Sequence, residues 1–169
     1  MLLEPTAFAA RLRDFERSAW RFEAQPVYTM PAERKSLARF LAGEPKPDDH
    51  NIAWRTNVQG IVASGRNIGR VRTVRRPLND YQRYQLAWGI PGNVEAGEDI
   101  RILDVTDADL GLPVQDFWLF DGRIVVNLNF RPDGTLVNIE QVDEPDLARY
   151  LAWQRTAMAA AVSFNEWNA

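Results

Sequence analysis

The segment Asp116–Gly122 constrains the fold more than any other part of the chain. Four consecutive large apolar residues, Phe117 to Phe120, stand between two aspartates. A strand that is apolar on successive residues buries both of its faces. The Asp121-Gly122 dipeptide tolerates the positive φ angles of a tight hairpin turn, and a second apolar run follows it. We therefore expect a buried central strand at 116–120 that forms a hairpin with a strand over 123–130.

Length and composition indicate one ordinary folded domain spanning residues 1–169. With 169 residues, the chain is expected to bury roughly 70% of its unfolded surface in one core. The absence of cysteine excludes disulfides, thiolate nucleophiles and cysteine-type zinc sites, and it fits a reducing, cytoplasmic location. The longest apolar stretch near either end is too short to span a bilayer, so we expect no membrane association.

Hydrophobic periodicity divides the chain into short helices and strands. Helical spacing predicts helices over 6–16, from Pro31 to Gly43, from an Asn79 N-cap onward, and from Asp143 to Phe164. Alternation predicts strands over 18–28, 52–58, 68–74, 100–105, 116–120, 123–130 and 136–142, with a long hairpin joining 52–58 to 68–74. The proline-rich loop 44–50 is the best candidate for a mobile segment.

The hairpin connections between the predicted strands are too short to join parallel strands. We therefore expect an α+β fold, with an antiparallel sheet of about six strands, built from hairpins and a meander, and three or four helices packed on it. Exposed edge strands in such a sheet would also allow a symmetric homodimer.

A cluster of arginines stands out in a chain whose net charge is −3. Arginine binds carboxylate or phosphate groups bidentately, so such a ladder suits an acidic partner, an anionic small molecule or a nucleic-acid backbone. Alternatively, the arginines are structural and pair across the sheet with acidic side chains such as Glu98, Asp99, Asp104 or Glu140. The cluster consists of Arg66, Arg70, Arg72, Arg75 and Arg76, followed by Arg83, and strand alternation places Arg70, Arg72 and Arg76 on one face.

Candidate catalytic groups are few. Asp116 and Glu140 lie on or near the central strand and are the candidates for a general acid and base, although Asp116 could instead satisfy backbone donors or an arginine at the strand end. His50 is the only histidine, which excludes metal sites that need two of them and leaves a serine triad dependent on one loop residue. No phosphate-binding glycine motif is present, and we expect no metal and no cofactor.

The aromatic residues are expected to form most of the core. Trp54 and Trp88 stand beside polar loops, and we expect one or both to be partly exposed. Tryptophan near arginine is typical of binding hot spots and ligand pockets, so these two residues are included among the candidate binding residues.

Several blocks of the sequence, taken together, resemble an uncharacterised actinobacterial family of soluble proteins of this length. The resemblance implies no established activity and transfers no catalytic residue. Members are often encoded beside helix-turn-helix regulators, which implies an accessory role in regulation or specialised metabolism. The blocks are Phe15–Glu23, Gly69–Val74, Pro77–Tyr84, Asn93–Glu98 and Asp116–Asp121.

Two functional hypotheses follow. The first is a non-enzymatic cytoplasmic protein that docks on a protein partner, such as a helix-turn-helix regulator, through the segment Arg66–Arg76; Arg70→Glu or Arg72→Glu should then weaken the complex without changing the melting temperature. The second is a small-molecule enzyme or ligand-binding protein in which Arg70, Arg72 and Arg83 hold an anionic group and Asp116 or Glu140 moves a proton. Direct DNA binding ranks third, because no helix carries a basic face and the pI is acidic.

Overall fold

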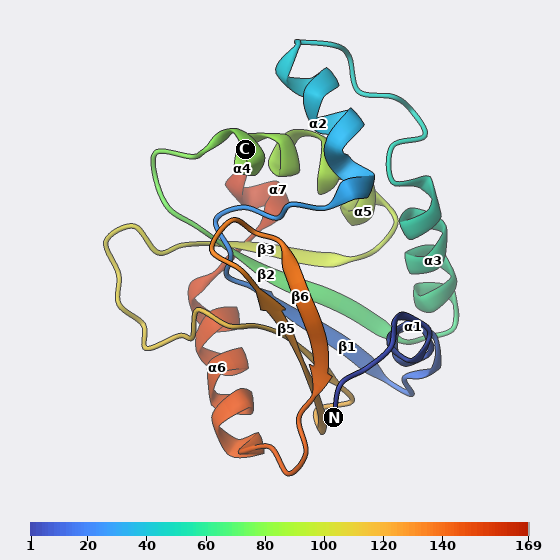
Figure 1. Ribbon diagram of the computed structural model, residues 1–169, viewed down its shortest axis with the longest axis vertical. Helices are drawn as coiled ribbons and strands as arrows, with labels where there is room; N and C mark the ends of the chain where they lie inside the picture. Colours follow the sequence, from blue (N-terminus) through green and yellow to red (C-terminus); the bar gives the residue numbers. More distant parts are fainter. Residues whose placement is uncertain (169) are drawn as a thin grey trace.

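A computed structural model describes residues 1–168 and shows one mixed sheet with helices on both faces (Figure 1). The order of its seven strands is β6-β5-β4-β1-β2-β3-β7. The strands are β1 (Ser18–Glu23), β2 (Asn67–Val74), β3 (Asp99–Asp104), β4 (Asp116–Phe120), β5 (Ile124–Phe130), β6 (Leu136–Gln141) and β7 (Val162–Ser163).

The middle of the sheet is parallel, which corrects the expectation of a wholly antiparallel sheet. β1 pairs with β2, and β2 with β3, in parallel register, whereas β1, β4, β5 and β6 form an antiparallel meander. The expected hairpin between 52–58 and 68–74 is wrong, because Ile52–Ala63 is the helix α3. The alternating residues at 52–58 resemble a strand, but Val58 and Ile61 are the buried residues of α3, three positions apart on one side of the helix.

Helices cover the two faces unequally (Figure 1). The helix α6 (Leu147–Ala160) covers one face, and α1 (Pro5–Asp14) and α3 lie against the other. The remaining helical segments gather at one end of the molecule. With them, the described residues form more helical segments than the three or four helices expected. The segments at this end are η1 (Pro31–Glu33), α2 (Arg34–Leu41), α4 (Asp80–Tyr84), a π-helical turn η2 (Gln85–Gly89), α5 (Pro91–Glu95) and α7 (Phe164–Trp167).

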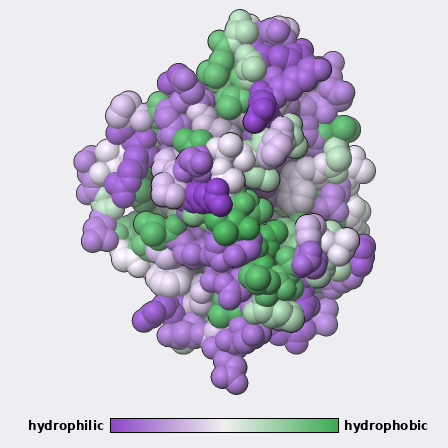
Figure 2. Space-filling view, in the orientation of Figure 1, coloured by the Kyte–Doolittle hydropathy of each residue, from purple (hydrophilic) through white to green (hydrophobic). Residues whose placement is uncertain are grey.

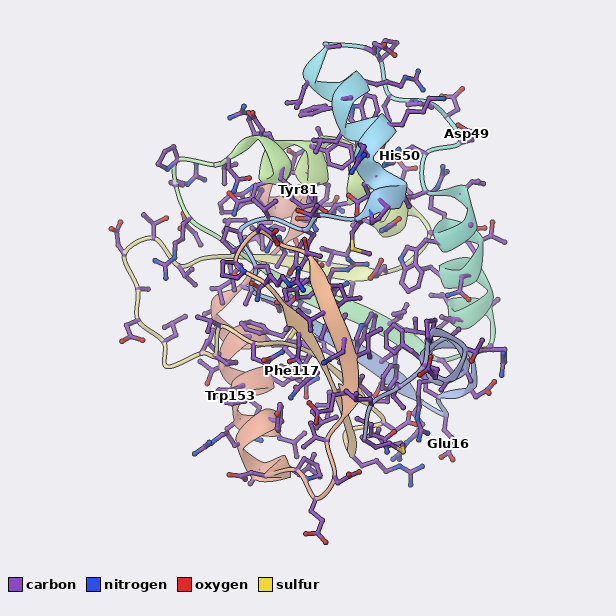
Figure 3. The ribbon with its side chains drawn as sticks, viewed as in Figure 1. Glu16, Asp49, His50, Tyr81, Phe117 and Trp153 are labelled. Atoms are coloured by element: carbon purple, nitrogen blue, oxygen red, sulfur yellow. The ribbon has the colours of Figure 1, made fainter. Side chains whose placement is uncertain are left out.

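Two hydrophobic clusters sandwich the sheet. Ala19, Trp118 and Phe120 pack toward α1 and α3, while Trp20 and Phe117 pack toward α6. Figure 3 shows Phe117 beside Trp153 of α6, and their ring centroids are 6.1 Å apart. Residues 1–168 contain no helix with the length and apolar character needed to cross a membrane.

The predictions that rest on neighbouring residues, namely the buried strand, its turn and the Asn79 cap, are confirmed. Every residue of β4 is buried, and the turn after it has φ angles of 54° at Asp121 and 66° at Gly122. Asn79 caps α4 through a reciprocal pair of hydrogen bonds with Gln82. The cap of α6 is Asp146 rather than Asp143.

Asp121 joins the hairpin to the start of β1. Its carboxylate accepts hydrogen bonds from the backbone N–H groups of Glu16, Arg17 and Ser18 at 2.9, 2.7 and 3.0 Å. Partial burial alone would raise the pKa of Asp121, but these three donors lower it below its ordinary value. The ionised form is therefore the one that the fold stabilises.

We predict that Asp121→Ala lowers the free energy of unfolding by about 1–2 kcal/mol, because three donors lose their acceptor and alanine disfavours positive φ. Asp121→Asn, which tolerates that backbone conformation, should cost less. Since the folded-state pKa is depressed, this stability is present above the ordinary aspartate pKa of 3.8 and is lost as the pH falls below it. Urea unfolding against pH measures both effects, and an equal loss in the exposed control Asp107→Ala would contradict the assignment.

Candidate functional site

Charged side chains line the face of the sheet that looks toward α1 and α3. In register, Arg21 of β1 stands beside Arg70 of β2 on one side and beside Trp118 of β4 on the other, and Glu23 stands beside Arg72. Because side chains alternate along a strand, Trp20 and Phe22 of β1 point to the α6 face instead. The parallel pairing of β1 with β2 thus builds a polar layer inside the molecule.

Arg70 is held between two buried carboxylates. Its Nη1 donates to Glu23 Oε1 at 2.8 Å, and its Nε donates to Glu98 Oε1 at 2.8 Å. The indole Nε1 of Trp54, on α3, donates to the other oxygen of Glu98 at 3.0 Å. Arg70, Glu23 and Glu98 are only 9%, 1% and 2% exposed. Glu98 and Glu23 therefore neutralise the guanidinium within the protein. Glu98 was among the acidic residues expected to pair with the arginines across the sheet, and Glu23 was not.

Arg21, which is partly buried, pairs with the buried Asp116. Arg21 Nη2 lies 3.4 Å from Asp116 Oδ2 and 3.9 Å from Glu23 Oε2. Asp116 is fully buried and also accepts the hydroxyl of Tyr28 at 2.5 Å and the N–H of Ala24 at 2.8 Å. Arg21 Nε is a buried donor without a partner. Donors thus surround Asp116, and the residue serves the fold.

Arg72 is buried more deeply than Arg70, at 1% exposure. Its Nε donates to Gln85 Oε1 at 2.7 Å, its Nη1 donates to the carbonyl of Gln25, and its guanidinium carbon lies 5.1 Å from the ring centroid of Tyr28. The Nε2 of the same Gln85 side chain donates to Glu23 Oε2 at 3.2 Å. The network therefore connects β1 and β2 to η2.

The pKa directions follow from this arrangement. Burial alone would raise the pKa of Glu23, but the guanidinium groups of Arg21, Arg70 and Arg72 lower it to about 2. Burial raises the pKa of Tyr28 well above its ordinary value. Burial also raises the pKa of Glu33, a carboxyl group that no arginine contacts directly.

Above this polar layer lies a cavity of about 440 Å³. The space-filling view shows a hollow between α5, α3 and β6, with apolar side chains below it (Figure 2). Figure 3 labels Tyr81 of α4 at the end of the molecule where α2 and the short helices gather. Polar residues form the floor and one end: Arg21, Glu23, Arg70, Tyr28, Glu33, Asn51, Tyr81, Gln85 and Asn93. Apolar residues form the walls: Phe8, Leu12, Met30, Trp54, Trp118, Leu128, Phe130, Leu136 and Ile139.

The other predicted site residues are dispersed. Arg76 and Arg83 are exposed and pair with Asp104 and Asp80, respectively, so neither reaches the cavity. Arg75 is also exposed, and Arg66 donates to the backbone carbonyls of Arg13 and Phe15.

The two tryptophans differ. Trp54 is half-buried, as expected, and lines the cavity. Trp88 is buried, because Phe40, Tyr84 and His50 surround its ring, so Trp54 is the one of the two that is partly exposed.

Asp116 and Glu140 point to opposite faces of the sheet. Glu140 pairs with Asn127, which pairs with Phe117, and Phe117 belongs to the α6 face. Asp116 alternates with Phe117 and contacts Arg21 on the other face. The two carboxyl groups therefore cannot act as one acid–base pair.

Sequence reasoning missed Arg21, Glu23, Glu33 and Asn93. A signal was present in β1, where charged residues alternate with Trp20 and Phe22 in a strand that has neighbours on both sides. Within residues 1–168, no group of three or more histidine, aspartate or glutamate side chains is arranged to hold a metal ion.

We predict that Arg70→Met lowers the free energy of unfolding by about 3–5 kcal/mol, because the buried Glu98 loses the arginine that pairs with it and the buried Glu23 loses the closer of its two arginines. Combining it with Glu98→Leu should cost less than the sum of the two single substitutions, and chemical unfolding of all four proteins measures that coupling. The matched control is the more exposed pair of Arg76, two residues beyond β2, with Asp104 at the end of β3, for which about 0–1 kcal/mol is expected. Additive effects at Arg70 and Glu98 would contradict the network.

Comparison with known proteins adds a family but no activity. No curated protein matches the sequence. The family described as a domain of unknown function, DUF6879, matches residues 6–169, which include every residue of the cavity and of the buried network. The match covers nearly the whole chain, and the protein therefore belongs to the DUF6879 family.

Proposed function

We propose that this protein binds a small molecule in the cavity above the buried arginine network. The observation that supports the proposal is the combination of a hollow of about 440 Å³, walls of apolar and aromatic side chains, and a floor of fixed polar groups. Sites for small ligands are concave and mostly apolar, with a few oriented polar groups that give specificity. Because the network holds those groups in place without a ligand, binding would need little ordering of the protein.

Binding without catalysis fits the geometry better than the acid–base alternative. Asp116 accepts hydrogen bonds from several donors and has no exposed surface, and Glu140 lies on the other face. Arg83, expected to hold an anionic group with Arg70 and Arg72, stays outside the cavity. A proton-transfer role for Asp116 or Glu140 thus finds no support in the arrangement.

The proposal predicts that filling the cavity abolishes ligand binding. Ile139 is on its wall, and Val137, two residues away on the same strand, is 52% exposed. Protein isolated gently from its source cell should carry a small molecule detectable by native mass spectrometry, and Ile139→Trp should lose it while Val137→Trp keeps it. Adding back the released molecule at 100 times its Kd should stabilise the wild type by about 2.7 kcal/mol.

Thermal melting of the two variants without ligand provides the control for folding. If Ile139→Trp folds normally and retains the molecule, the binding site lies elsewhere and the proposal fails.

A role in docking a protein partner stays a second proposal, and one observation favours it at a different surface. Arg70 and Arg72 are buried, but Val114 is 85% exposed and Leu110 is 37% exposed. Both line a groove of about 360 Å³ together with the exposed Arg75. An exposed apolar patch beside a cation suits a partner with apolar and acidic side chains.

We predict that Arg75→Glu combined with Val114→Glu removes any stoichiometric partner recovered with the tagged protein from lysate of its source cell, because the partner would meet reversed charge and lose apolar contact. Val137→Glu, an exposed apolar position on the edge strand β6, is the matched control and should retain that partner. Retention by the double variant would exclude this groove as the docking surface.

The sequence resemblance supports a link between the two proposals. It points to actinobacterial proteins encoded beside helix-turn-helix regulators, so we propose an accessory role in which a bound small molecule affects contact with such a regulator. The cytoplasmic location and specialised-metabolism context expected from the sequence stay predictions.

A further inference from the structure

The floor of the cavity is balanced in charge before any ligand binds. Arg21, Glu23 and Arg70 line it, and Arg72, Glu98 and Asp116 complete a network in which each carboxylate contacts an arginine within 4.0 Å. Arg70, the arginine between Glu23 and Glu98, would have to leave one of them to bind an anion. Uncovering a buried carboxylate in this way is costly. The network consists of Arg21, Arg70 and Arg72 with Glu23, Glu98 and Asp116.

Glu33 also lines the cavity, but it is not part of this ion-pair network. Its Oε2 accepts the hydroxyl of Tyr81 at 2.9 Å, and among residues 1–168 no lysine or arginine lies within 4.0 Å of its oxygens. Glu33 and Tyr81 also line a groove of about 430 Å³ on the other side and a smaller hollow of about 90 Å³. Glu33 therefore stands where three hollows adjoin, and its carboxyl group forms no ion pair within the described part of the chain.

Asn93 adds a second acceptor to the same end of the cavity. It is only 4% exposed, and its Oδ1 has no hydrogen-bond partner. It lines the cavity and, with Glu33, the small hollow beside it. A buried acceptor without a donor is costly, so a ligand that donates hydrogen bonds gains at this position.

Aromatic rings enclose this end. The rings of Tyr28 and Tyr81 meet edge to face with centroids 5.9 Å apart, and the ring of Phe130 meets Tyr28 in the same manner at 5.1 Å. Trp54 lines the cavity from α3. Aromatic faces attract cations, and this attraction strengthens when water is excluded.

We infer that the cavity binds an organic amine, with its protonated nitrogen at Glu33 and Asn93 and its apolar body along the wall formed by α1, β5 and β6. Arg21 Nε, the unpartnered donor in the floor, suits a neutral oxygen on the same ligand. This inference rests on the proposed function and specifies the chemical class of its ligand. It differs from the anionic ligand that the arginine cluster predicted, because the arginines already have their counter-charges.

Three probes that share one body test the charge preference: phenethylamine, 2-phenylethanol and 3-phenylpropionate. Each is titrated to millimolar concentration into ¹⁵N-labelled protein, and the indole N–H signals of Trp54 and Trp118 report on the cavity. We expect phenethylamine to bind at least about tenfold more tightly than the other two, as a charge-assisted hydrogen bond in a buried site would give. Ile139→Trp should abolish all three responses.

The variant Glu33→Gln keeps the size of the side chain and removes its charge. It should weaken phenethylamine binding about tenfold and leave 2-phenylethanol binding unchanged. Glu44→Gln is the matched control, because Glu44 is exposed and pairs with Arg39 away from the cavity, and it should change neither.

The outcomes separate the ligand class from the existence of the site. Equal or tighter binding of the acid or the alcohol, abolished by Ile139→Trp, overturns the amine inference and supports the pocket. Amine binding that Glu33→Gln does not weaken also overturns the inference. If none of the probes shifts either indole signal, the amine inference fails. The proposed function is then tested separately, by whether the wild type, but not Ile139→Trp, retains a native molecule in native mass spectrometry.

Discussion

The ion pairs of Arg70 with Glu23 and Glu98 are the interaction on which this structure depends. They join β1 and β2 to the segment that follows α5, and Trp54 extends the contact to α3 through Glu98. A charge this deeply buried tolerates few arrangements, since each polar atom needs a partner. The network therefore fixes how the crossover helices sit on the parallel part of the sheet, and by doing so it determines the shape of the cavity above them.

Stability alone does not account for this network. A buried ion pair is weak evidence for stability, because well-packed apolar residues of similar volume often stabilise a fold equally well or better. The α6 face shows that alternative within the same sheet, since the buried side chains of Trp20, Phe22 and Phe117 pack there against other apolar residues. A polar floor beneath a hollow on one face, and a filled apolar core on the other, indicate that the two faces have different tasks.

Sequence reasoning succeeded where the determining contacts are local. The Asp121-Gly122 turn, the buried strand before it and the Asn79 cap all follow from neighbouring residues. It failed at Ile52–Ala63, because alternation over seven residues also fits a helix whose buried residues, Val58 and Ile61, are three apart. The site depends on the parallel pairing of β1 with β2, which brings Arg21 beside Arg70. These residues are 49 positions apart in the sequence, and no local pattern predicts that they are neighbours. The structural alternative therefore included Glu98 but missed Glu23, the second carboxylate that pairs with Arg70.

The same pairing changes the meaning of the arginine cluster. Read along the chain, these residues form a positive segment, and a positive segment predicts an anionic partner. In the fold, Arg70 and Arg72 turn inward, Arg21 joins them, and three carboxylates from other segments balance their charge. The cavity wall then presents the carboxyl group of Glu33, which has no ion-pair partner in the described residues, together with the acceptor of Asn93 and the surrounding rings. The chemistry of a buried site is set by the charges that its own protein leaves unmatched, even where the sequence is richest in the opposite sign.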